Sequence, residues 1–328
     1  MRARQRFLST AILLLLLSTA FAGCLDENGD DDEQDTPRTI ERPEWEPGLN
    51  WLYTFTTPEF DEMASRLVVA GNDGTNYQVG VVSQTDAQRH AVLNFNPILG
   101  RVSMEEFGIY ENGIPQTILS FPLEKDKSWS FDLLDVEDFD AVVTDITNAD
   151  LAGGGETVLV TVEARAPGGH TLDYIYDTEA GWLRSFVHRN AAGEVQLEMT
   201  LVSSAEDYQG RVYFIRASDL YDGSYASSAG DPVFQVNDTF VNAGHPSGDF
   251  DDLIYYGEVE TQDGGGNVHL RDYTGDSHYS ETYSSDTTKS TMGTVRSSSG
   301  DWTVQISLEG SATLRFRIAG GINYFWDV

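Results

Sequence analysis

The chain has 328 residues, and 53 acidic residues against 20 lysines and arginines give it a formal net charge of −33. Binding to nucleic acid depends on a basic surface that neutralises phosphates, so this charge excludes nucleic acid as a partner, and an anionic membrane surface would repel the chain. Hydrophobic residues make up 40% of the sequence, enough for a globular core, and the length predicts two domains.

The first 23 residues have the pattern of a secretory signal peptide. Three arginines within the first six residues precede an unbroken apolar run at 11–17, and small residues follow it. A positive start, a short apolar segment and small residues at the end predict a signal peptide over 1–23. The apolar segment at 7–22 is shorter than the ~20 residues of a permanent membrane-spanning helix. We therefore expect export.

Cys24 is the only cysteine, and it follows the end of the apolar segment. The residues Phe21-Ala22-Gly23-Cys24 resemble the lipobox of prokaryotic lipoproteins, with Phe21 where that family usually has an aliphatic residue. The resemblance implies that Cys24 is lipidated and holds the protein at the outer face of the cytoplasmic membrane. Stable anchoring takes two chains, which a diacylglyceryl or archaeal diether group supplies. The alternative is an ordinary secretory signal with an incidental cysteine.

Residues 24–44 form a predicted disordered acidic tether. Seven of the ten residues at 26–35 are Asp or Glu, and none of the ten is large and apolar. Such a segment repels itself and stays solvated.

The amino-acid usage resembles that of proteins from salt-loving archaea. Three lysines stand against 17 arginines, and 31 Asp exceed 22 Glu. The resemblance implies a surface kept soluble in concentrated salt, where a Debye length of about 3 Å at 1 M screens the self-repulsion. The alternative is a generic acidic surface protein of a marine or mesophilic prokaryote.

Aromatic residues alternate along predicted strands in the first predicted domain, at 45–207. Trp51, Tyr53 and Phe55 share one face of a strand, and Trp129 and Phe131 repeat the spacing. Later runs alternate similarly between short turns, which predicts antiparallel neighbours. The further predicted strands are at 66–70, 77–83, 90–94, 156–164, 170–176, 181–187 and 194–202.

Two sequence features of this domain resemble the β-rich half-barrel lipoproteins of bacterial and archaeal envelopes. One is the motif Pro47-Gly48-x-x-Trp51-x-Tyr53. The other is the run at 176–183, where a strand ends, a turn with an acidic residue and glycine follows, and the next strand begins. The resemblance covers 45–205 and implies a curved sheet.

Short strands with Gly, Ser and Asp connections are predicted in the second domain, at 208–328. Their spacing predicts a β-sandwich of jelly-roll or immunoglobulin-like kind. The three glycines at 264–266 predict a hairpin turn, and the polar stretch 273–299 predicts long loops. The Gly-x-Trp-Thr-Val segment around Trp302 resembles a strand of small accessory β-domains, which implies that Trp302 anchors the core. The predicted fold class is therefore all-β, with two antiparallel domains.

No catalytic motif stands out in the sequence. It has no Gly-x-Ser-x-Gly elbow and no His-Glu-x-x-His, and its six histidines are scattered. We therefore expect no enzymatic activity and no cofactor, with Ca²⁺ as the one candidate. Asp249, Asp251 and Asp252 can offer hard oxygen ligands to Ca²⁺, and the alternative is a solvated acidic loop. Asn237 begins an Asn-x-Thr sequon that predicts N-glycosylation.

Three functional hypotheses follow from these observations. The leading one is a lipid-anchored extracellular surface protein with a binding or envelope-structural role, whose partner is an extracellular protein, glycan or apolar ligand. The second is a carrier or chaperone for a lipid or apolar ligand, held in a cavity lined by the aromatic side chains Trp51, Tyr53, Phe55, Trp129 and Phe131. The third is a secreted hydrolase acting on surface glycans or peptides. A closed apolar pocket in the first domain favours the carrier, and two converging titratable groups in a polar cleft favour the hydrolase.

Overall fold

The computed structural model of the protein describes residues 38–328, except 59, 94–95, 112 and 152. The predicted signal peptide at 1–23, Cys24 and most of the tether at 24–44 lie outside the described residues. The described residues form one compact unit, and none of their helices is long and apolar enough to cross a membrane. The division into domains at 45–207 and 208–328 stays a prediction.

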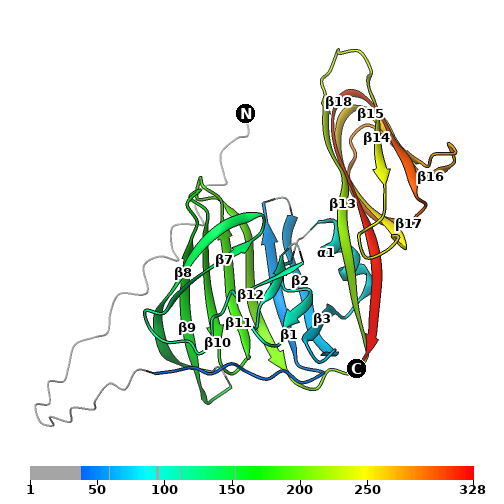
Figure 1. Cartoon of the computed structure of the whole chain (residues 1–328). Coiled ribbons are helices and arrows are strands. Elements are labelled where there is room, and N and C mark those ends of the chain that lie inside the picture. The colour runs from blue at the N-terminus through cyan, green and yellow to red at the C-terminus, as the bar shows by residue number, and fades with distance from the viewer. Residues whose placement is uncertain (1–37, 59, 94–95, 112, 152) are drawn as a thin grey trace, which may run out of the picture. The chain divides into compact units, whose positions relative to one another are not determined.

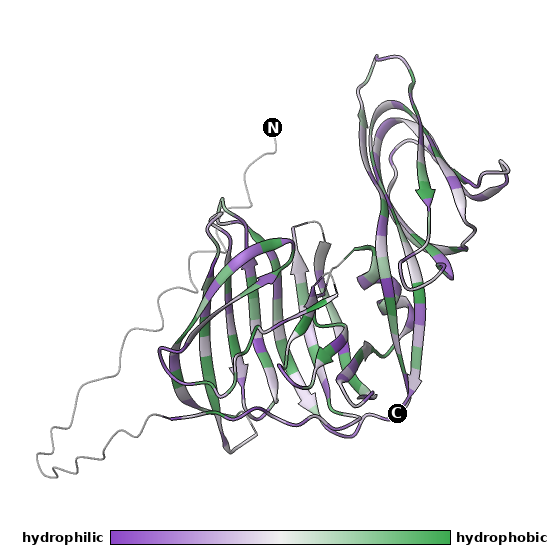
Figure 2. Cartoon of the chain, viewed as in Figure 1, coloured by the Kyte–Doolittle hydropathy of each residue, from purple (hydrophilic) through white to green (hydrophobic). Residues whose placement is uncertain are grey.

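Antiparallel strands make up most of the described chain, and one helix, α1 (Gln84–Val92), lies among them (Figure 1). The predicted all-β fold class is therefore confirmed. Figure 2 shows hydrophobic and hydrophilic residues alternating along the strands. Successive side chains of a strand point to opposite faces, so this alternation buries one face of the sheet against the core.

The first part of the sheet pairs in the order β7-β8-β9-β10-β11-β12-β1-β2-β3-β4-β5-β6. The sheet is curved (Figure 1), as the resemblance at 45–205 implies, and β6 and β7 stand at the two ends of this order. The strands are β1 (Asn50–Thr57), β2 (Phe60–Asn72), β3 (Asn76–Val81), β4 (Gly100–Ser103), β5 (Ile109–Glu111), β6 (Ile114–Gln116), β7 (Ser128–Leu133), β8 (Val136–Asp150), β9 (Glu156–Arg165), β10 (Thr171–Asp177), β11 (Trp182–Arg189) and β12 (Val195–Ala205).

Aromatic rings from four separate segments pack together in the first core. The ring centroid of Trp45 lies 5.0 Å from that of Trp51, 4.9 Å from that of Trp182 and 4.7 Å from that of Phe107. The indole N–H groups of Trp45 and Trp51 donate hydrogen bonds of 2.9 and 2.7 Å to the carbonyl oxygens of the turn at 180–181. Buried indoles need such acceptors, so these bonds fix the turn to the core.

Helix α1 occupies part of the segment where a strand was predicted at 90–94, and that prediction was wrong. Ser83 caps the helix, since its Oγ accepts a 3.1 Å hydrogen bond from the backbone N–H of Asp86. Ala87 and Ala91 are four residues apart and both are buried, as expected for one face of a helix. The short apolar run after His90 is the last turn of this helix, and so short a run does not distinguish helix from strand.

Long strands form the second part of the sheet. The strand β18 pairs with β15 along most of its length, with β14 through its first half and with β13 through its second half. Ile215, Ile254 and Ala319 from this part of the chain join the first hydrophobic core. The strands are β13 (Arg211–Ser227), β14 (Phe234–Asn242), β15 (Asp252–Arg271), β16 (Ser277–Tyr283), β17 (Thr288–Arg296) and β18 (Gly300–Asp327).

The glycines at 264–266 lie inside β15, so the hairpin turn predicted there was wrong. Gly264 pairs with Gly310 of β18, and both have positive φ, +90° and +70°. A Cβ on Gly310 would overlap the backbone oxygen of Asp263, so only glycine allows this approach. Side chains from both sides of this point on β15 and β18 share a second core, which shows that the sheet folds over itself here. The two layers of the expected sandwich therefore consist of the same long strands.

The stretch 273–299 is also more regular than predicted. It contains β16 and β17, both paired with β15, where long polar loops were expected. Many of their residues are Ser and Thr with exposed side chains, and threonine favours extended backbone although it contributes little to a hydrophobic pattern. Trp302 is fully buried in the second core, as the sequence resemblance implied.

Candidate functional site

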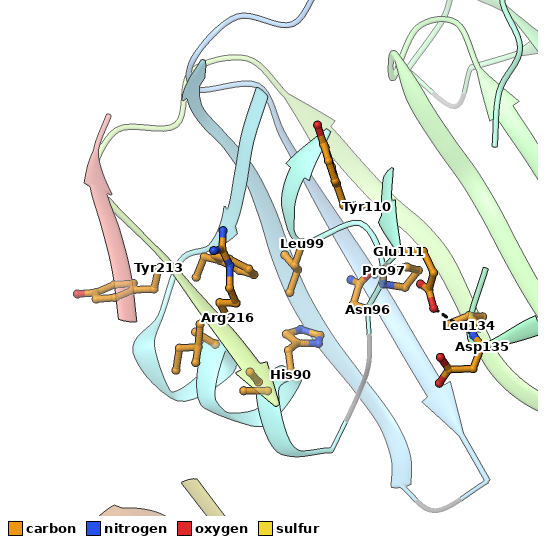
Figure 3. A pocket seen from close by; sticks show the side chains of 15 residues that line it. His90, Asn96, Pro97, Leu99, Tyr110, Glu111, Leu134, Asp135, Tyr213 and Arg216 are labelled. Carbon is orange, nitrogen blue, oxygen red and sulfur yellow. Dashed lines mark hydrogen bonds between the residues drawn. The ribbon is translucent and has the colours of Figure 1, made fainter. Parts of the chain in front are cut away.

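A cleft of about 440 Å³ lies between α1, the loop after it, the strand β5, the turn at 134–135 and β13 (Figure 3). Fifteen residues line it. Most of the lining is apolar, and Ala87 and Ala91 of α1, Leu99 of the following loop and Ile215 of β13 contribute to it. Binding sites for small molecules are typically concave and apolar with a few polar groups, and they enclose about 300–1,000 Å³.

Two glycines allow β13 to lie against the first part of the sheet beside this cleft. A Cβ on Gly80 would lie 2.5 Å from the backbone oxygen of Tyr213, and one on Gly100 would lie 2.6 Å from the Phe214 ring. Tyr213 is also the residue of β13 that pairs with Val81 of β3. The close approach places residues 213–217 opposite α1, where they form one wall of the cleft.

Asn96 supplies a polar group within the lining. Its side chain is buried, with 8% of its surface exposed, and its Oδ1 accepts a 3.1 Å hydrogen bond from the backbone N–H of Ile98. This bond fixes the amide, and Nδ2 is buried without a hydrogen-bond partner. In Figure 3 the Asn96 side chain lies between Leu99 and Glu111. The wall of the cleft therefore includes a fixed amide whose Nδ2 is covered by the protein and has no acceptor among the described residues.

Charged side chains lie on two sides of the cleft. Glu111 and Asp135 are on one side, where Glu111 Oε1 accepts a 3.1 Å hydrogen bond from the backbone N–H of Asp135 (Figure 3). Arg216 of β13 is across the lining from them, and its guanidinium donates a 3.0 Å hydrogen bond to Ser247 Oγ and lies 5.3 Å from the centroid of the Tyr324 ring. The cleft therefore has an acidic side and a basic side.

The five aromatic residues predicted as ligand-cavity candidates belong to the first hydrophobic core: Trp51, Tyr53, Phe55, Trp129 and Phe131. None of them lines the cleft. The Tyr53 hydroxyl donates to the carbonyl oxygen of Leu183, and burial raises the pKa of Tyr53 well above its usual value. Phe55 packs against His90, which does line the cleft, with ring centroids 5.3 Å apart. The ligand role of these five residues stays a prediction.

The acidic residues predicted to bind Ca²⁺ lie just before β15 and at its start. Asp251 accepts a 2.8 Å hydrogen bond from the backbone N–H of Asn323, and Asp252 accepts one of 2.7 Å from its side-chain amide. Asp249 does not share these contacts in the described structure. Among the described residues, no three or more His, Cys, Asp or Glu side chains are grouped to hold a metal ion. Calcium binding at these residues stays a prediction.

The two predicted modification sites have different positions relative to the described chain. Asn237 is exposed on β14, and its Oδ1 accepts a 3.1 Å hydrogen bond from Gln305 Nε2. Its glycosylation stays a prediction. Cys24, the predicted lipidation site, lies outside the described residues.

The polar residues of the cleft were missed by the sequence analysis. Asn96, Glu111, Asp135 and Arg216 come from four separate segments, and no short motif links them. The one local feature is backbone conformation, because the turn residues Leu134 and Asp135 both have φ of +56°. Non-glycine residues seldom adopt this conformation, so the sequence does not reveal it.

Two of the six histidines, which looked scattered in the sequence, lie side by side. His170 Nδ1 is 3.3 Å from His188 Nε2, and the His188 side chain is buried. Burial, together with the nearby His170, lowers the pKa of His188 to about 4. The native protein therefore holds His188 in its neutral form.

No protein-family model and no curated protein matches the sequence. The structure is weakly similar to several solved structures. MucB, in its complex with MucA(peri), has a TM-score of 0.25 and 10% identity over 80% of this chain and 88% of that one. An exo-β-1,3-galactanase from Phanerochaete chrysosporium has a TM-score of 0.19 and 8% identity over 78% and 65% of the two chains. A family 43 arabinoxylan arabinofuranohydrolase from Bacillus subtilis has a TM-score of 0.17 and 14% identity over 81% and 64%. Similarity at this level assigns no function.

Proposed function

We propose that this protein is an exported binding protein that is anchored through a lipid on Cys24 and holds a small ligand with an apolar body in the cleft between α1 and β13. The signal-peptide pattern at 1–23 and the lipobox-like residues support export and anchoring. The acidic segment at 24–44 supports a spacer between lipid and folded body. This ligand site lies at the edge of the first core, and not among the aromatic residues of the strands that were the candidates from the sequence.

The observation that carries this proposal is the mainly apolar cleft, whose lining also includes the polar residues Asn96, Glu111 and Arg216. The apolar walls supply affinity through burial of the ligand's body. A volume of about 440 Å³ accommodates a small molecule of this kind.

Probe binding tests the site. The neutral dye N-phenyl-1-naphthylamine fluoresces more strongly in apolar surroundings, so we expect its fluorescence to rise on titration with the protein. Ala217 lines the cleft from β13 and is half-buried, so Ala217→Trp fills the space the dye would occupy. We expect this substitution to weaken dye binding at least about tenfold, since a bulky ring removes most of the apolar contact area.

The matched control is Ala192→Trp, which adds the same side chain at an exposed turn position away from the cleft. The control is expected to bind the dye as the unsubstituted protein does. Circular dichroism establishes that both variants are folded. Equal dye affinity in folded Ala217→Trp and in the unsubstituted protein would place the site elsewhere and refute the proposal.

The anchor is tested separately from the cleft. We expect mass spectrometry of the mature protein, isolated from the membranes of an expressing prokaryotic host, to show an N-terminal Cys24 carrying two lipid chains. Cys24→Ser removes the acceptor thiol and should release the protein from the membrane fraction. A mature chain in which unmodified Cys24 is still joined to Gly23 would contradict lipid anchoring and leave the cleft proposal intact.

A further inference from the structure

We infer that the ligand of this cleft is an organic cation, with an ammonium group beside Glu111 and Asp135 and an apolar body along the rest of the lining. The inference rests on the proposed function and specifies the chemical class of the ligand. It is drawn from a difference between the charged groups of the cleft: among the residues that the structure describes, carboxylate oxygens of Glu111 and Asp135 have no partner, whereas Arg216 has two.

The carboxylates on the acidic side retain capacity for a cation. One oxygen of Glu111 accepts the backbone N–H of Asp135. The other oxygen of Glu111 and both carboxylate oxygens of Asp135 have no hydrogen-bond or ion-pair partner among the described residues. Glu111 is half-buried, so its charge is only partly compensated by solvent. An ammonium group offers several N–H donors to such oxygens, and charge-assisted bonds of this kind are the stronger ones.

The guanidinium of Arg216, on the basic side of the cleft, already has partners within the protein. The Arg216 guanidinium donates to Ser247 and lies over the Tyr324 ring, so a contact from the protein occupies both its edge and its face. These contacts hold Arg216 on the opposite side from Glu111 and Asp135, and no ion pair joins it to either in the described structure (Figure 3). An anionic ligand would have to compete with Ser247 and Tyr324 for the Arg216 guanidinium. A cationic ligand would instead contact the carboxylates of Glu111 and Asp135, which have unpaired oxygens in the described part of the chain.

The apolar residues of the lining indicate where the rest of the ligand lies. In Figure 3 Leu99 lies between Arg216 and Glu111. With the ammonium group beside Glu111, the apolar body of the ligand then lies toward Leu99 and Ile215. The net charge of −33 also raises the local concentration of cations around the protein.

Three amphiphiles with one chain length test the charge preference: octylammonium, octanol and octanoate. Each is titrated against protein loaded with N-phenyl-1-naphthylamine, and the concentration that displaces half of the dye is measured at low salt. Octylammonium should displace the dye at a concentration about tenfold lower than octanol, as expected for charge-assisted bonds, and octanoate should be weakest. Adding salt should reduce this preference, because exposed charges are screened.

The double variant Glu111→Gln, Asp135→Asn removes both charges and keeps the shape of the side chains. In this variant, octylammonium and octanol should displace half of the bound dye at similar concentrations, whatever the variant's own affinity for the dye. The control Glu137→Gln removes an exposed acid two residues from Asp135 that does not line the cleft, and it should keep the preference.

The possible outcomes separate this inference from the proposed function. If the dye binds in the cleft and the three amphiphiles displace it equally, or octanoate displaces it best, the ligand is not a cation and the binding function stands. A preference for octylammonium that persists in the double variant also overturns the inference. If the unsubstituted protein binds no dye, both the proposed function and the inference fail.

Discussion

Gly310→Ala is expected to lower the free energy of unfolding by about 4 kcal/mol, because the added methyl group has no space and the backbone conformation disfavours it. Gly310 has φ of +70°, where a non-glycine residue is strained. Its Cβ would overlap the backbone oxygen of Asp263, which cannot move as a side chain can. Relief requires β15 and β18 to separate where the sheet folds over, and that would open the second core.

Gly193→Ala separates the two contributions. Gly193 has a similar φ of +80°, and a Cβ there would meet nothing within 4 Å. This variant therefore carries the conformational cost alone, about 1 kcal/mol. Urea unfolding of both variants in the same salt measures the difference. Equal losses for Gly193→Ala and Gly310→Ala would mean that the close approach of the two strands is not required for stability.

His188 should make the protein acid-sensitive. Its pKa is about 4 in the folded protein, below the value of about 6.5 in an unfolded chain. The unfolded chain therefore takes up a proton first as the pH falls. The stability that neutral His188 contributes is fully present above pH 6.5, is lost progressively down to pH 4, and amounts to about 3 kcal/mol over this range.

The measurement compares urea unfolding at pH 7.5 and pH 4.5 for the unsubstituted protein and His188→Gln. Glutamine keeps a polar side chain and does not titrate. Between pH 7.5 and pH 4.5 the variant should therefore lose less unfolding free energy than the unsubstituted protein, and the difference should be most of the ~3 kcal/mol. Carboxylates titrate in the same range, and the comparison removes their contribution because both proteins share them. His269→Gln, on β15 and away from the pair, should behave as the unsubstituted protein does. Parallel pH profiles for His188→Gln and the unsubstituted protein would show that His188 is not the group responsible.

Much of the fold follows from local patterns in the sequence. Trp51, Tyr53 and Phe55 alternate with more exposed residues, and this alternation correctly predicts a strand with one buried face. The predictions were wrong where the local sequence favours one conformation and pairing with a distant segment imposes another. The glycines at 264–266 suggest a turn by composition, but their partners on β18 are some 40 residues away, and close backbone approach is visible only in the folded sheet.

The cleft could not be predicted, because its chemistry depends on tertiary proximity. Asn96 is ordinary in the sequence, and it becomes informative only because its Nδ2 is buried without an acceptor. Glu111 and Asp135 are two of 53 acidic residues, and nothing in the sequence distinguishes them from the others. For the same reason, the proximity of His170 and His188 was not apparent, although His170 directly precedes β10 and His188 lies in the neighbouring strand β11.

The strand β18 pairs with three others, and all three precede it in the chain. During synthesis, β13, β14 and β15 therefore cannot pair with their common neighbour until the last segment of the chain has been made. A polypeptide released before residue 300 would present unpaired strand edges, which readily associate with other chains. Folding of this half of the protein is thus tied to completion of the chain, and incomplete molecules should be preferred substrates of proteases.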